Sequence, residues 1–146
     1  MKKLGCIMLI DDSETDNFIH TRRLNKMEVA DLVVVRKNGR EGLSYLQELA
    51  DCPRPDLLFL DINMPVMDGW EFLDEYEKLA EEYRARVTIV MLTSSVGDTD
   101  HSRAGTYRAI NGNVAKPLTE SKIRDIMTAH FSPPDAPRLS LVPPAE

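Results

Sequence analysis

The stretch DLLFLDINMPVMDG, residues 56–69, places a carboxylate directly after an apolar run. The segment DLLFL, residues 56–60, shows little alternation of apolar and polar side chains, which is typical of a strand that helices cover on both faces of a parallel sheet. Asp61 follows at once, and Pro65 and Gly69 then indicate a stiff turn. The stretch therefore predicts a buried strand that carries a charged side chain to the edge of a sheet.

Four further apolar segments are predicted to be strands: CIMLI (6–10), DLVVV (31–35), VTIVML (87–92) and NVAK (113–116). Helical spacing of apolar side chains predicts helices between them, over residues 14–27, 39–50, 69–84, 98–110 and 119–131. The pattern is weakest in 98–110. Ser13 and Thr119 are expected to cap the first and last helices, with Ser13 and Asp16 in capping-box spacing. This strand–helix alternation predicts an α/β fold with a parallel sheet and right-handed crossovers.

Length and composition predict one domain and a tail. The 146 residues suit a single domain, assigned here to residues 1–131, and residues 132–146 hold five of the nine prolines, which predicts a flexible tail. The net charge of −6 argues against direct binding to nucleic acid or to a membrane surface. The N-terminal apolar run is too short for a signal peptide or a membrane span, so a cytoplasmic protein is expected.

Polar residues follow four of the predicted strands. They are Asp11 and Asp12 after the first, Asp61 after the third, Thr93 after the fourth and Lys116 at the end of the fifth. Parallel strands present their carboxyl ends at one edge, where such folds bind ligands. Each residue alone would suit a turn, a helix cap or an exposed surface position. Their joint occurrence instead predicts one cluster of carboxylates, a hydroxyl and an ammonium.

That cluster has a consistent chemistry. Neighbouring carboxylates repel one another unless a cation lies between them, and Mg²⁺ prefers carboxylate oxygens and often binds beside a phosphate. A lysine ammonium suits a phosphoryl oxygen, to which a threonine hydroxyl can also donate. The set is therefore interpreted as a carboxylate nucleophile that takes a phosphoryl group.

The sequence resembles the receiver domain of two-component response regulators, of the standalone, chemotaxis-receiver type. The resemblance covers residues 4–131 and is carried by LIDDSE (9–14), LFLDINMPVMDGWEFL (58–73), VMLTSS (90–95) and NVAKPLT (113–119). It implies a flavodoxin-like (βα)5 fold with a five-stranded parallel sheet in the order 2-1-3-4-5 and helices on both faces.

The resemblance also implies roles for single residues. Asp61 matches the phosphoacceptor, Asp12 the direct Mg²⁺ ligand, and Asp11 the acid that binds the ion mostly through water. Asn63 matches the position that offers its backbone carbonyl to the metal. Thr93 matches the switch hydroxyl.

The resemblance also sets expectations for Lys116, Gly69 and Asn113. Lys116 matches the lysine that contacts the phosphoryl group, and its peptide bond to Pro117 is often cis in the family. Gly69 is expected in a backbone conformation closed to other residues. Asn113 stands where the family often has an aromatic residue coupled to the threonine, and Tyr107 is the nearest aromatic upstream.

The resemblance implies a phosphorylated switch that is not a conventional enzyme. A sensor histidine kinase or a phosphotransfer protein would donate to Asp61, and an effector protein would bind the altered surface. No output domain follows the receiver segment, so action by docking is expected, and a phosphorylation-linked dimer stays open. Two alternatives are a phosphorylation-independent adaptor and, less favoured, an aspartate-nucleophile phosphatase. The phosphatase would require a second Asp at position 63, which is Asn63.

Overall fold

The computed structural model describes residues 3–48, 54–62, 69–92 and 107–131. Five strands lie in these segments: β1 (Leu4–Ile10), β2 (Ala30–Arg36), β3 (Leu57–Asp61), β4 (Val87–Leu92) and β5 (Gly112–Ala115). The helices are α1 (Glu14–Met27), α2 (Gly39–Gln47), α3 (Gly69–Tyr76) and α5 (Glu120–Phe131), with a short 3₁₀ helix η1 (Glu81–Tyr83). All five predicted strands are confirmed, each within about two residues of its expected bounds.

The strands form one parallel sheet in the order β2-β1-β3-β4-β5, as expected. Its register decides which strand ends meet. Ile10 pairs with Leu60, and Asp61 pairs with Met91. The residues that follow β1 and end β3 therefore reach the same edge of the sheet.

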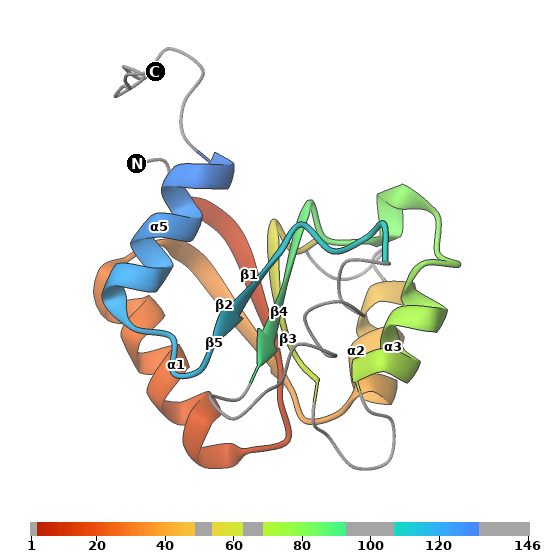
Figure 1. Cartoon of the computed structure of the whole chain (residues 1–146), viewed down its shortest axis with the longest axis horizontal. Helices are drawn as coiled ribbons and strands as arrows, with labels where there is room; N and C mark the ends of the chain where they lie inside the picture. Colours follow the sequence, from red (N-terminus) through yellow and green to blue (C-terminus); the bar gives the residue numbers. More distant parts are fainter. Residues whose placement is uncertain (1–2, 49–53, 63–68, 93–106, 132–146) are drawn as a thin grey trace.

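Two hydrophobic clusters cover the two faces of the sheet, and Figure 1 shows the corresponding helix layers, α1 and α5 on one side and α2 and α3 on the other. In β1, Met8 and Ile10 belong to the cluster with α2 and α3, whereas Ile7 and Leu9 belong to the cluster with α1 and α5. Successive strand side chains point to opposite faces. This double burial is why the strands lack polar alternation.

Side-chain caps begin three helices. The Ser13 hydroxyl accepts from the Asp16 N–H at 3.2 Å, and the Thr119 hydroxyl accepts from the Lys122 N–H at 3.2 Å, so both predicted caps are confirmed. The Asn38 side chain accepts from the Glu41 N–H at 2.9 Å to begin α2. Each of these bonds satisfies one N–H group that a helix start leaves without a partner.

The predicted helix over residues 69–84 is too long, because α3 ends at Tyr76 and η1 follows separately. Arg54 supplies a physical reason. Its Nε donates to the Arg84 carbonyl at 2.7 Å and its Nη2 to the Glu81 carbonyl at 2.9 Å. These long-range bonds stabilise an irregular backbone that the local apolar spacing did not indicate.

The bounds of two other predicted helices differ from the structure, and part of each helix lies outside the described residues. Residues 107–110, the end of the helix predicted over 98–110, form a turn, and 98–106 lie outside the described residues. The helix predicted over 39–50 ends at Gln47, and residues 49–50 are likewise not described. None of the described helices is long and apolar enough to cross a membrane.

Gly69 is required for close packing rather than for a special backbone conformation. The expected left-handed conformation is wrong, because no described glycine has a positive φ. A Cβ at Gly69 would instead meet the Ile62 Cα at 2.6 Å and the Asp61 carbonyl oxygen at 2.9 Å. The start of α3 therefore lies directly against the end of β3, where the acceptor candidate sits.

Candidate functional site

Three carboxylates meet at the carboxyl edge of the sheet, as the sequence predicted. Asp11, Asp12 and Asp61 can each offer a carboxylate oxygen such that the three atoms lie within 4.8 Å of one another. Asp11 and Asp61 are buried, with 0% and 2% of their surface exposed, whereas Asp12 is exposed. The cluster is thus open to solvent at Asp12 and closed behind Asp11.

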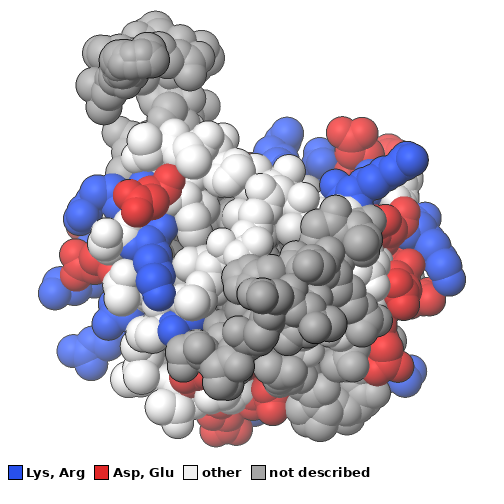
Figure 2. Space-filling model, in the orientation of Figure 1, with Lys and Arg blue, Asp and Glu red and all other residues white. Residues whose placement is uncertain are grey.

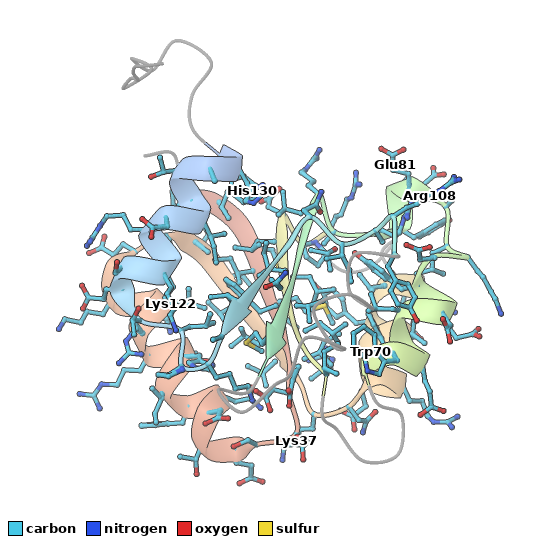
Figure 3. All side chains as sticks on the ribbon, in the orientation of Figure 1. Lys37, Trp70, Glu81, Arg108, Lys122 and His130 are labelled. Atoms are coloured by element: carbon cyan, nitrogen blue, oxygen red, sulfur yellow. The ribbon has the colours of Figure 1, made fainter. Side chains whose placement is uncertain are left out.

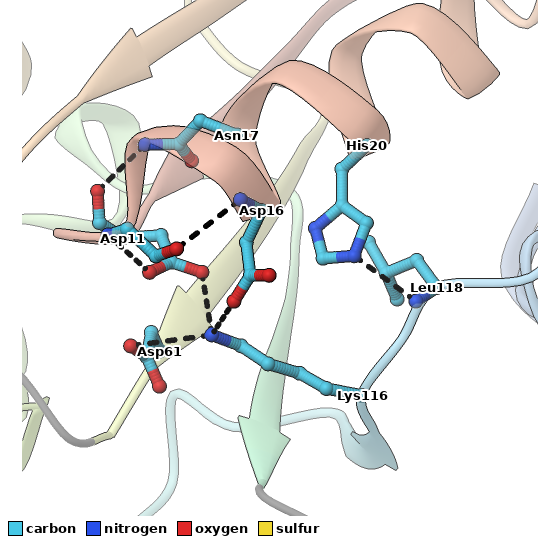
Figure 4. A network of polar contacts seen from close by, with 8 residues as sticks. Asp11, Asp16, Asn17, His20, Asp61, Lys116 and Leu118 are labelled. Carbon is cyan, nitrogen blue, oxygen red and sulfur yellow. Dashed lines mark hydrogen bonds and ion pairs between the residues drawn. The ribbon is translucent and has the colours of Figure 1, made fainter.

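Lys116 reaches into this cluster from the end of β5 (Figure 4). Its ammonium nitrogen lies 2.7 Å from Asp11 Oδ2, 2.9 Å from Asp16 Oδ2 and 3.4 Å from Asp61 Oδ2. Burial alone would lower the pKa of Lys116, but the contacts with Asp11 and Asp16 and the charge of Asp61 outweigh it and raise that pKa. The side chain is therefore a cation that offsets part of the acidic charge.

Asp16 is the site residue that the sequence did not single out. Its spacing from Ser13 indicated a capping box, in which the acid returns a bond to the cap residue. Instead, Asp16 accepts from Lys116, and Asp11 Oδ1 takes the Ser13 N–H at 2.9 Å. The hydrogen bond from Lys116 is the main reason why the pKa of Asp16 is lowered. No local pattern could have revealed this contact, because 100 residues separate the partners.

Asp11 is held in place by the start of α1. Besides the Ser13 N–H on its Oδ1, the Asn17 side-chain amide donates to the Asp11 carbonyl at 2.8 Å. The buried Oδ2 is ion-paired with the Lys116 ammonium at 2.7 Å and has no other hydrogen-bond partner among the described residues. As a carboxylate oxygen it has a second lone pair available for a further partner.

These donors fit a hard divalent cation. Carboxylate oxygens are the ligands that Mg²⁺ prefers, and the exposed Asp12 leaves room for the waters that this ion retains. Asp11 Oδ2 can accept from Lys116 with one lone pair and still offer the other to the same ion. Two predicted members of the site, Asn63 and Thr93, lie outside the described residues.

Helix α1 also fixes the segment that carries Lys116. His20 Nε2 accepts from the Leu118 N–H at 3.2 Å, and Arg23 Nη1 donates to the Leu118 carbonyl at 2.6 Å. The Lys116–Pro117 peptide bond is cis, as the resemblance implied. Burial is the main reason why the pKa of His20 is lowered, which favours the neutral imidazole that can accept this bond.

The aromatic residues near the site are arranged differently from the common family pattern. Trp70 at the start of α3 stacks on Tyr107, with 5.9 Å between ring centroids, and the Tyr107 hydroxyl donates to Asp74 at 2.9 Å. Asn113 is exposed on β5.

Figure 3 shows Lys37 and Trp70 toward the end where the strands finish, with Glu81 and Arg108 toward the opposite end.

Comparisons with known proteins agree on one family. The family model of the response regulator receiver domain matches residues 7–128. The response regulator Rcp1 of Synechocystis sp. is 30% identical over 97 residues, which are 64% of this chain and 65% of that protein. The chain thus spans just under two thirds of that relative's length. The chemotaxis protein CheY of Halobacterium salinarum is 28% identical over 84% of this chain and 92% of its own length.

A solved structure supports the same assignment. The crystal structure of a two-component response regulator from Cytophaga hutchinsonii matches with a TM-score of 0.76 and 27% identity. The match covers 88% of this chain and 97% of that one.

Proposed function

Because the chain belongs to the family of response regulator receiver domains, we propose that it accepts a phosphoryl group on Asp61. The observation that supports this most directly is the position of Asp61. Its carboxylate ends a buried strand, shares a cluster with Asp11 and Asp12, and lies 3.4 Å from the ammonium of Lys116. Acceptor, cation ligands and counter-charge therefore converge at one sheet edge.

The reaction that fits is an in-line transfer from a phosphohistidine of a sensor kinase or phosphotransfer protein. An Asp61 oxygen bonds to phosphorus while the bond from phosphorus to the histidine nitrogen breaks, and the electron pair leaves with the imidazole. The single carboxylate charge is replaced by roughly −2 on the phosphoryl group. Lys116 is already placed to offset part of that increase.

Mg²⁺ is the proposed cofactor. Asp11, Asp12, Asp61 and the backbone carbonyl of Asn63 would hold it, and when bound it supplies positive charge beside the transferred phosphoryl oxygens. The ammonium of Lys116 contacts Asp11, Asp16 and Asp61 and supplies a second positive charge at the site. Thr93 is proposed to donate its hydroxyl to the phosphoryl group and so to bias the neighbouring surface toward its active form.

The output is proposed to be a change in affinity for an effector protein, with a phosphorylation-linked dimer as a further outcome. The chain is proposed to act in the cytoplasm, with residues 1–131 as the receiver and 132–146 as a flexible tail. Direct nucleic-acid binding is not proposed, because the net charge is −6 and Figure 2 shows basic and acidic side chains interspersed on the face it draws.

Phosphoryl uptake is tested by intact-mass analysis after incubation with acetyl phosphate and Mg²⁺. The unmodified chain should gain one phosphoryl group, and Asp61→Asn should gain none. Asp31→Asn is the matched control. Asp31 is an exposed aspartate on the edge strand β2, and its carboxylate pairs with Lys3. Uptake by Asp61→Asn equal to that of Asp31→Asn would refute the assignment.

The same preparations separate the phosphorylated switch from the alternatives. A phosphorylation-independent adaptor would bind its effector equally well before and after treatment. A phosphatase would release phosphate from the donor continuously, with no lasting mass change. The cluster of Asp11, Asp12 and Asp61 beside Lys116 supports the switch over the adaptor, and Asn63 in place of a second acid disfavours the phosphatase.

A further inference from the structure

The ammonium of Lys116 contacts two separate sets of carboxylates, which are the cluster of three acids and Asp16. Asp11, Asp12 and Asp61 converge within 4.8 Å, and Asp16 is not part of that group. Lys116 contacts both sets, with its ammonium 2.9 Å from Asp16 Oδ2, 2.7 Å from Asp11 Oδ2 and 3.4 Å from Asp61 Oδ2. Figure 4 shows the Asp16 and Asp61 carboxylates approaching the ammonium from separate elements, α1 and β3.

A divalent cation in the cluster would compete with Lys116 for the same oxygens. Asp11 Oδ2 pairs with the ammonium at 2.7 Å and belongs to a carboxylate of the cluster. Like charges repel strongly in a partly buried site. An ammonium whose only carboxylates were those of the cluster would have to be displaced for the cation to bind.

Asp16 gives the ammonium a separate carboxylate, and the fold fixes the geometry of that contact. Asp16, His20 and Arg23 lie at positions i, i+4 and i+7 of α1, on one face of the helix. His20 and Arg23 hold the N–H and the carbonyl of Leu118, two residues after Lys116. The helix that carries Asp16 therefore also fixes the backbone from which Lys116 extends.

The local role that the sequence suggested for Asp16 is taken over by another residue. In a capping box the Asp16 carboxylate would accept from the Ser13 N–H, but Asp11 Oδ1 holds that group at 2.9 Å. The side chain of Asp16 is 37% exposed, so solvent can reach it, and its carboxylate accepts a hydrogen bond from Lys116. The contact with Lys116 is therefore its main interaction.

We propose that Asp16 is a positioning residue that keeps the Lys116 ammonium beside Asp61 while a divalent cation occupies the Asp11–Asp12–Asp61 cluster. Lysine and cation then act together instead of excluding one another. The proposal rests on the phosphoacceptor function, because that function gives the arrangement its use. What it predicts directly is that Asp16 affects the cation affinity of the cluster through Lys116.

A double-mutant cycle in Mg²⁺ affinity tests the coupling, with the full chain titrated with Mg²⁺ alone in a calorimeter. Asp16→Asn should weaken Mg²⁺ binding by about threefold to tenfold, because the ammonium then depends wholly on the cluster oxygens. In the Lys116→Met background the same substitution should change affinity by less than about twofold, since no ammonium is left to compete. Asp16→Glu should retain most of the affinity.

Glu14→Gln is the matched control. Glu14 also lies in the first turn of α1, is exposed, and pairs with Lys37 at 3.2 Å, so its loss removes a nearby negative charge without touching Lys116. It should leave Mg²⁺ affinity within about twofold. Circular dichroism and thermal unfolding of every variant would establish that each one folds.

Three results would overturn the proposal: unchanged affinity in Asp16→Asn, an equal loss in both lysine backgrounds, or no Mg²⁺ binding by the unmodified chain. A further kinetic readout follows. Asp16→Asn should need more Mg²⁺ for half-maximal phosphoryl uptake yet approach the unmodified rate at saturation. Failure of Asp61 labelling would refute the phosphoacceptor function separately, because the calorimetric cycle does not depend on phosphorylation.

Discussion

The buried imidazole of His20 accepts a hydrogen bond from the Leu118 N–H, 3.2 Å away, and so ties α1 to the segment just after Lys116. The bond requires an unprotonated Nε2. His20 Nδ1 is buried and has no hydrogen-bond partner among the described residues. This arrangement makes the link sensitive to protonation of a single side chain.

The pKa of His20 is lowered mainly by burial, with Lys116 and Arg23 adding to the effect and Asp16 and Asp11 opposing it. The unfolded chain therefore binds a proton here more readily than the folded protein does. The contribution of His20 to stability is complete above the pKa of the unfolded chain, about 6.5. It is lost as pH falls from there through the lower pKa of the folded protein. The slope cannot exceed about 1.4 kcal/mol per pH unit.

His20→Gln tests this dependence, because a glutamine carbonyl can still accept from the Leu118 N–H. We expect urea unfolding between pH 7.5 and 5.5, as an order-of-magnitude window around about 6.5, to show a smaller loss of stability in the variant. Carboxylate contributions are common to both proteins and cancel in the comparison. Parallel stability curves would mean that His20 does not contribute.

Lys116→Met should lower the free energy of unfolding by about 1–3 kcal/mol without Mg²⁺, because it leaves the buried Asp11 and Asp61 without their cation. Added Mg²⁺ should stabilise this variant more than the unmodified chain, since no ammonium competes for the cluster. Chemical denaturation with and without Mg²⁺ measures both effects. Lys37→Met, at an exposed ion pair, should change stability by at most about 0.5 kcal/mol.

Gly69→Ala should destabilise the fold by about 1–3 kcal/mol, because its Cβ would meet the Ile62 Cα at 2.6 Å. The displaced backbone includes the Asp61 carbonyl, so phosphoryl uptake from acetyl phosphate should also slow. Gly5→Ala is the control, since its Cβ would lie 3.4 Å from Asp56 Oδ2, an ordinary contact. Equal stability and equal uptake in the two variants would contradict the close-packing account of Gly69.

Tyr76→Phe should cost about 1–3 kcal/mol of stability, measured by urea denaturation. The buried Tyr76 hydroxyl accepts from the Ala85 N–H at 2.9 Å and pairs with the Thr88 hydroxyl at 2.9 Å. Its removal leaves both groups buried with one partner fewer. Tyr83→Phe, at a residue 42% exposed, should have little effect, and a loss as large as that of Tyr76→Phe would argue against the hydrogen-bond explanation.

The sequence by itself determined the order of the strands along the chain and the residues at their ends. Uninterrupted apolar runs such as residues 57–60 indicate burial on both faces, because a half-buried strand would alternate. Asp11 and Asp61 stand at the ends of two such strands and Lys116 follows the short last strand, and the parallel-sheet rule placed all three at one edge. These signals are short-range, so a linear sequence carries them.

The tertiary structure decided which groups touch. The parallel register aligned Ile10 with Leu60 and so placed Asp11 beside Asp61. The packing of α1 against the β5–α5 segment brought the Asp16 carboxylate into contact with Lys116, although the sequence suggested that Asp16 takes part in a helix cap. Long-range bonds from Arg54 to the backbone of residues 81 and 84 favour the irregular turn that follows α3, where apolar spacing alone predicted one long helix. Contacts between residues 27 to 100 positions apart depend on sheet register and crossover geometry, which local propensity does not encode.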